Sequence, residues 1–177
     1  MSPSDFEPCP NCGALLPVMD SPTHRYIGAS PACWAIYSAL NAGEPPIAPT
    51  PYNALLVDAY AAQHYGVPSP QAIQSVAVHL ITMYGILEQG QSIERAIWLR
   101  TRPLRDGKTA KQSRFHWLTP PIFAGSLTVA DIVQAPTPAA RAVVVTQYVE
   151  SVWSIWALEQ RATVAEWYAR FVLADHL

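Results

Sequence analysis

Four of the Ser-Pro and Thr-Pro pairs in this chain constrain its fold more than any other feature of the sequence. A serine or threonine just before a helix accepts hydrogen bonds from the unpaired N–H groups of the first turn. A proline at the first helical position removes no intrahelical donor. The pairs are Ser30-Pro31, Thr50-Pro51, Ser69-Pro70 and Thr137-Pro138, and each precedes a segment with a helical pattern. We therefore predict helices that begin at these sites, and an all-α helical bundle.

Glycine and proline mark the predicted ends of these helices, because glycine readily adopts the left-handed conformation that ends a helix and proline cannot continue one. Gly43, Gly66 and Gly90 end the first three. Thr128 and Asp131 have the spacing of a capping motif for a short helix that ends before Pro136. The predicted helices cover about 31–41, 51–65, 70–89, 92–100, a short segment from 128, and the last segment from 138.

The last segment keeps a helical pattern from Pro138 to about Ala174, roughly 36 residues that would span ~54 Å. A globule of this size has a diameter of roughly 40 Å. The segment should therefore either bend near 151–154 or project and pair with a second copy, which predicts a homodimer through the C-terminal helix. Tryptophans at positions 153, 156 and 167 share one face, which is more typical of a core than of a ligand platform.

The most specific chemical signal is Cys9-Pro-Asn-Cys12-Gly13 near the N-terminus. Two cysteines two residues apart form a turn that points both sulfurs at one metal, and zinc takes four such ligands in a tetrahedron. Downstream His24 and Cys33 complete the pattern Cys-x2-Cys-x11-His-x8-Cys. We interpret Cys9, Cys12, His24 and Cys33 as ligands of a structural zinc ion, with water or another side chain as the alternative to His24.

Two other interpretations of the cysteines are open. Cys-Pro-x-Cys also occurs in dithiol redox proteins, but there the pair follows a strand and opens a helix, whereas here only eight residues precede it. Three unrelated buried thiols are the remaining alternative. Cys33 favours the metal, because it falls in the first turn of the predicted helix from Pro31, where the helix dipole stabilises a thiolate.

Composition limits the class of protein. Half of the residues are hydrophobic and 14% are charged, which is typical of a globular protein, and we expect a single domain over 1–177 with a zinc-binding segment at 1–36 packed on a bundle at 50–177. A long stretch without Asp, Glu, Lys or Arg, 65–87, contains prolines, glutamines and a histidine, so we expect no membrane association. Lack of a signal peptide and an odd cysteine count predict a cytoplasmic protein.

A second group of polar residues lies in the predicted helices. If the helices over 51–65 and 70–89 form an antiparallel hairpin, Asp58 and His79 lie at one level and His64 lies nearer the turn. With Glu150 or Glu159 from the last helix, this group could act as acid and base or hold a second metal. The alternative is a structural hydrogen bond that satisfies a buried histidine.

Residues 100–114 hold six of the eleven basic residues against one aspartate. Such a loop could contact an anion or nucleic acid. Without interleaved aromatic residues it is a weak nucleic-acid signal, and we favour a solvated loop.

Three blocks of this chain resemble a family of uncharacterised bacterial proteins, a domain of unknown function. The blocks are Cys9-Pro-Asn-Cys-Gly-Ala14 with 24–31 and Cys33-Trp34; 57–64 with 75–80 and 87–88; and 152–156. The resemblance implies a metal-associated helical protein without an established reaction. Relatives have a histidine where Asn53 stands and a His-His pair where Glu159-Gln160 stand, so any second metal site that those histidines form is altered or lost here.

Two functional hypotheses follow, and the sequence does not decide whether the protein is an enzyme. In the first, the bundle is a small-molecule enzyme or binding protein with a polar site around Asp58, His64, His79 and Glu159. In the second, zinc is purely structural and the protein acts on a protein or nucleic-acid partner through the 100–114 loop or the C-terminal helix. Asp58 and His79 are predicted to lie at one level in the core. This placement favours the first hypothesis, because burying such groups costs free energy that a scaffold does not need to spend.

Overall fold

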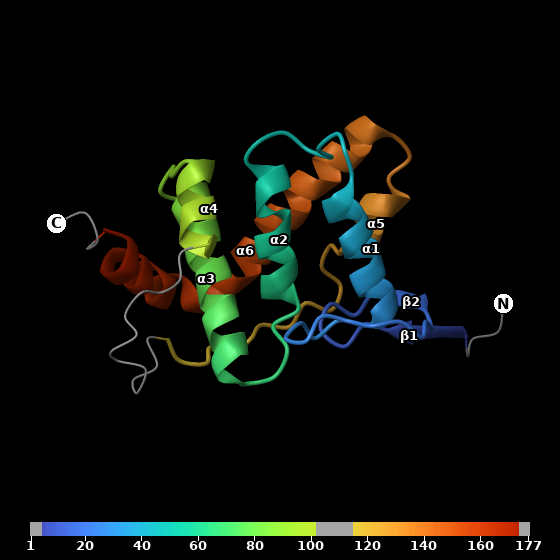
Figure 1. Ribbon diagram of the computed structural model, residues 1–177, viewed down its shortest axis with the longest axis horizontal. Coiled ribbons are helices and arrows are strands. Elements are labelled where there is room, and N and C mark those ends of the chain that lie inside the picture. Colours follow the sequence, from blue (N-terminus) through green and yellow to red (C-terminus); the bar gives the residue numbers. More distant parts are fainter. Residues whose placement is uncertain (1–4, 102–114, 174–177) are drawn as a thin grey trace.

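The computed structural model describes residues 5–101 and 115–173, and these ranges form a helical bundle with one small β-hairpin (Figure 1). The all-α prediction is confirmed. The elements are β1 (Phe6–Pro8), β2 (Leu15–Pro17), α1 (Pro31–Ala42), α2 (Tyr52–Gln63), α3 (Pro70–Leu87), α4 (Ile93–Thr101), α5 (Val129–Gln134), α6 (Pro138–Tyr168) and a π-helical turn, η2 (Ala169–Leu173). The basic stretch 102–114 lies outside the described residues.

Three of the four predicted hydroxyl caps form as expected. The side chains of Ser30, Ser69 and Thr137 accept hydrogen bonds from backbone N–H groups in the first turns of α1, α3 and α6. At the fourth site the peptide bond from Thr50 to Pro51 is cis, and α2 begins without a side-chain cap. Thr128 forms the expected capping box at the start of α5.

α6 is an unbroken α-helix of 31 residues. At 1.5 Å per residue it is roughly 46 Å long, and it crosses the molecule in contact with α2, α3 and α5 (Figure 1). Trp153, Trp156 and Trp167 are buried, as the core interpretation predicted. The Trp156 indole donates to the carbonyl of Ala62 at 3.1 Å, which fixes α6 against the end of α2.

The N-terminal segment contains the two-stranded hairpin. β1 and β2 are antiparallel, with Phe6 opposite Pro17, and the cysteine turn connects them. Strands of three residues carry too little alternation for a sequence pattern to show them. The segment then returns along the end of α2 to reach α1.

Two glycines hold this returning segment against the α2–α3 connection. The N–H of Gly28 donates to the carbonyl of His64 at 3.0 Å. Gly66 has a φ of +67°, and a Cβ there would lie 2.6 Å from the carbonyl oxygen of Tyr26. Only glycine allows so close a backbone approach in that conformation.

Among helices of the described ranges, none has the length and apolarity that crossing a bilayer requires.

Candidate metal centre

The turn between β1 and β2 presents two sulfurs to one point. The N–H of Cys9 donates to the carbonyl of Ala14 at 2.8 Å, and the N–H of Gly13 donates to the carbonyl of Cys9 at 2.9 Å. Gly13 has a φ of +74°, a conformation that glycine adopts at little cost. This turn buries Cys9 and Cys12 side by side, each only 1% exposed.

The other two members of the cluster come from helix ends. Cys33 lies in the first turn of α1, and its N–H donates to the capping hydroxyl of Ser30 at 3.4 Å. His64 is the residue that directly follows α2. Both side chains are fully buried. The N-terminus of one helix and the C-terminus of another therefore face the cysteine turn.

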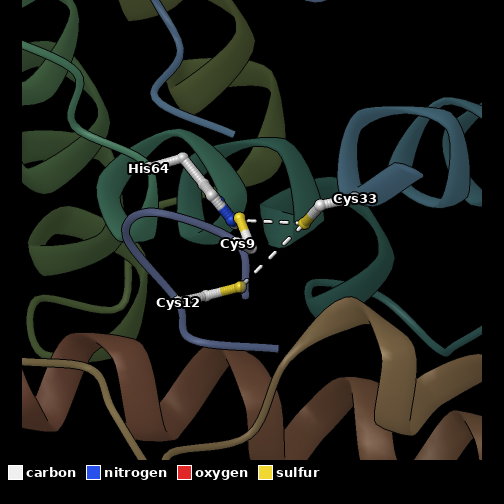
Figure 2. A group of neighbouring side chains, drawn as sticks. All are labelled: Cys9, Cys12, Cys33 and His64. Carbon is white, nitrogen blue, oxygen red and sulfur yellow. Dashed lines mark hydrogen bonds between the residues drawn. The ribbon is translucent and has the colours of Figure 1, made fainter. Parts of the chain in front are cut away.

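The four candidate ligand atoms lie close enough together to surround one ion. The sulfurs of Cys9, Cys12 and Cys33 and a ring nitrogen of His64 lie within 4.8 Å of one another (Figure 2). Zinc–sulfur and zinc–nitrogen bonds of about 2.3 and 2.05 Å imply ligand separations of roughly 3.8 Å between sulfurs and 3.6 Å between sulfur and nitrogen. The distance from Cys33 Sγ is 4.0 Å to Cys12 Sγ and 3.3 Å to His64 Nε2. These four residues could hold a metal ion.

Hydrogen bonds around the cluster prepare it for a cation. His64 Nδ1 lies 2.9 Å from the carbonyl oxygen of Tyr60, so Nδ1 carries the proton and Nε2 keeps its lone pair toward the sulfurs. The Tyr60 hydroxyl donates to Cys33 Sγ at 3.7 Å, and the N–H of Ser30 donates to Cys9 Sγ at 3.4 Å. Donors aimed at sulfur favour the thiolate form that binds metal.

Without a cation, the three thiols cannot all ionise together. Hydrogen bonds from Cys12 and Cys33 lower the pKa of Cys9. The hydrogen bond with Cys12, followed by that with Cys9 and by burial, raises the pKa of Cys33. The contact with Cys33 lowers the pKa of Cys12, but the bond to Cys9 and burial outweigh it and raise this pKa to about 12. A divalent ion would supply the positive charge that allows all three thiols to ionise together.

The structure places His64, and not His24, beside the three sulfurs. His24 is exposed, its Nδ1 accepts a hydrogen bond from the N–H of Tyr26 at 3.3 Å, and its ring packs against Trp34. His24 has the sequence spacing of a ligand, but the buried histidine in the fourth position is His64, at the end of α2. The three predicted cysteines do lie together.

The other predicted polar group does not assemble as a single site. His79 Nδ1 lies 2.8 Å from Asp58 Oδ1, the contact that the hairpin register predicted, with Asp58 fully buried and the His79 side chain 16% exposed. His64 belongs instead to the cysteine cluster. Glu159 is exposed on α6.

The sequence interpretation missed two residues of α2, Tyr60 and Gln63, that lie next to members of the cluster. Tyr60 touches two members of the cluster and stacks on Tyr37, with ring centroids 3.9 Å apart and planes 9° apart. Gln63 accepts a hydrogen bond from the buried Tyr148 hydroxyl at 3.0 Å and donates to the Leu127 carbonyl at 2.8 Å. A signal existed, since Tyr60, Gln63 and His64 have the three- and four-residue spacing that places side chains on one face of a helix.

Comparison with known proteins adds a family and no activity. No curated protein and no solved structure matches this chain. The sequence profile of one family, described as a family of unknown function (DUF5946), matches residues 7–157, which include all four members of the cysteine–histidine cluster. The match spans most of the chain, in agreement with the resemblance noted from its sequence blocks. The chain thus belongs to the family of unknown function DUF5946.

Proposed function

We propose that this protein is a zinc-binding helical protein in which the ion is structural. The observation that carries the proposal is the buried set of three sulfurs and one imidazole within 4.8 Å. Sulfur-rich tetrahedral sets select zinc among the common cellular metals. The zinc ion would join the β1–β2 turn, the start of α1 and the end of α2, three segments far apart in the chain.

A structural role fits this site better than a catalytic one. Catalytic zinc keeps an open position for water or substrate, whereas structural zinc has four protein ligands. All four side chains here are at most 1% exposed, which leaves no route for a substrate to the ion. The ion would stabilise the N-terminal segment, whose short hairpin is too small to fold alone.

Elemental analysis of purified, untagged protein tests the proposal. We expect one zinc per chain in the wild type and in His24→Ala, and loss of zinc in His64→Ala. His79→Ala serves as a second control, because His79 pairs with Asp58 away from the sulfurs, and its zinc content should stay at one per chain.

The outcomes separate the alternatives. Zinc that is retained in His64→Ala but lost in His24→Ala would show that His24, and not His64, is the fourth ligand. Protein prepared and reconstituted without oxygen that still binds no zinc would refute the metal site. A second equivalent of metal that disappears with His79→Ala would show an additional site in the bundle.

A second candidate function is small-molecule chemistry at the Asp58–His79 pair, and one observation favours it. The buried carboxylate accepts the Nδ1 proton of a histidine that keeps partial exposure, which leaves Nε2 able to take a proton from a ligand. Burying a carboxylate costs free energy that a simple scaffold does not require.

Thermal-shift measurements with a panel of small molecules test this second candidate. A compound that acts at the pair should raise the Tm of the wild type and of His116→Asn, an exposed histidine elsewhere, but not that of His79→Asn. A panel in which every stabilising compound acts equally on all three proteins would count against it.

A further inference from the structure

Arg95, in the first turns of α4, is a cation without an ion-pair partner among the residues that the structure describes. Its guanidinium lies over the ring of Trp98 at 3.8 Å from the centroid, and its Nη2 donates to the carbonyl of Val172 at 3.1 Å. Its Nε is buried and has no hydrogen-bond partner. Within 5–101 and 115–173, no carboxylate lies within ion-pair distance of Arg95. Arg95 as a whole is half-buried, and proteins seldom remove a guanidinium group from water without pairing it.

A second buried donor lies beside this one. Tyr168, the last residue of α6, is 3% exposed, and its hydroxyl also has no hydrogen-bond partner. Val172, which accepts from Arg95, lies four residues later in η2, on the same side of the helix. A π-helical turn such as η2 often marks a functional position. Two unsatisfied donors, one of them cationic, therefore lie together.

Gly85 on α3 creates the space for the Tyr168 ring. A Cβ at position 85 would lie 3.0 Å from Tyr168 Cε2 and 3.6 Å from Gln91 Cγ. The N–H of Gln91 donates to the carbonyl of Gly85 at 2.9 Å, which brings Gln91 to the same place. Three side chains with polar ends, from the α3–α4 connection, α4 and α6, therefore converge.

The electrostatics agree with this arrangement. Burial raises the pKa of the Tyr168 phenol, while the Gln91 amide and the Arg95 guanidinium act in the opposite direction. Gln91 is thus near the hydroxyl, although it does not meet hydrogen-bond geometry. The phenol stays protonated at neutral pH and can donate.

We propose that Arg95 and Tyr168 bind the carboxylate of a small-molecule ligand or metabolite. One oxygen would accept from Nε–H of Arg95 and the other from the Tyr168 hydroxyl, and the charge of the ligand would neutralise the guanidinium. Two donors match the two oxygens of a carboxylate. A phosphate shares this oxyanion chemistry but brings more charge and oxygens than the two donors satisfy. The site is independent of the cysteine cluster.

The test uses the full-length, metal-loaded protein with acetate and inorganic phosphate as probes, at constant ionic strength with chloride as the reference anion. Acetate at about ten times its Kd should raise Tm by about 3–6 °C. Titration calorimetry should give a Kd that rises about tenfold to a hundredfold in Tyr168→Phe and in Arg95→Lys, since each removes one donor to a charged group. Arg161→Lys, an exposed arginine paired with Glu88, is the matched control and should bind acetate as the wild type does.

Each outcome decides the proposal. Acetate binding that depends on both donors supports it, and phosphate binding tighter than acetate with the same dependence would reassign the ligand to a phosphate. Heat and Tm changes no larger than those of chloride in the wild type would overturn it, leaving a bridging water as the partner of both donors. Binding that survives in Tyr168→Phe and Arg95→Lys would overturn it as well.

Discussion

Replacing Gly66 by alanine should destabilise the protein far more than the same change at Gly90. Both glycines have left-handed backbones, with φ of +67° and +63°. That conformation costs an alanine about 1–2 kcal/mol at either position. A Cβ at Gly90 meets nothing within 4 Å, whereas at Gly66 it would lie 2.6 Å from the Tyr26 carbonyl oxygen. Gly90→Ala therefore measures the conformational cost alone.

The additional cost at Gly66 can be worked from its contacts. Forcing the backbone at Tyr26 away resembles overpacking, about 1–3 kcal/mol. The same shift strains the bond from the Gly28 N–H to the His64 carbonyl, a net ~0.5–1.5 kcal/mol. The total is about 3–6 kcal/mol for Gly66→Ala against about 1–2 for Gly90→Ala.

Urea unfolding followed by circular dichroism would measure both free energies on zinc-loaded protein. The difference corresponds to a Tm gap of roughly 4–16 °C. Because His64 lies two residues before Gly66, chelator competition should also show weaker zinc binding in Gly66→Ala only. Equal losses of stability in the two variants would refute the close backbone approach.

Three further results are expected. In metal-free protein, the pKa values of Cys12 and Cys33 are raised, so the folded state keeps both thiols protonated after the unfolded chain begins to ionise. The free energy of unfolding should therefore fall as pH rises above the unfolded thiol pKa of about 8.5, by up to about 2.7 kcal/mol per pH unit for two thiols. The zinc-loaded protein holds thiolates and should instead lose stability as pH falls below about 8.5; urea midpoints at pH 7.5 and 9.5 with and without zinc would reveal this opposite dependence. Tyr60→Phe removes the hydroxyl that reaches Cys33 and should weaken zinc binding about tenfold in chelator competition, and an unchanged affinity would exclude a role for that bond. Glu88→Gln keeps the size of the group that accepts from the Trp153 indole at 3.0 Å but removes its charge, so we expect a loss of about 1–2 kcal/mol in urea unfolding, and no loss would mean that the carboxylate does not hold α3 to α6.

The helices were predictable because their signals are local. Ser30, Ser69 and Thr137 accept hydrogen bonds from backbone N–H groups three positions later. Neighbouring residues in the sequence are therefore enough to identify these caps. Thr50 has the same letters and forms no such cap. The Asp58–His79 contact could also be predicted, since an antiparallel hairpin with a short connection leaves only one register for its two helices.

The fourth member of the metal cluster could not be predicted in the same way. The spacing between ligands is informative only within one short segment of the chain, and His24 has the spacing that such a segment requires. His64 reaches the sulfurs only because α2 packs on α1 and because Gly28 and Gly66 allow the N-terminal segment to lie against the end of α2. That arrangement depends on long-range packing, which no local pattern encodes. The donors Arg95 and Tyr168 converge for the same reason, from helices far apart in sequence.

The spread of the cluster along the chain has a consequence for biosynthesis. Cys9 and Cys12 leave the ribosome first and can capture an ion only weakly, with two of the four ligands. Cys33 follows with α1, and the set is complete only when all of α2 has emerged. Until then the thiols are exposed and incomplete as a ligand set, so with the structural zinc proposed above, the supply of metal during translation would govern the yield of correctly assembled protein.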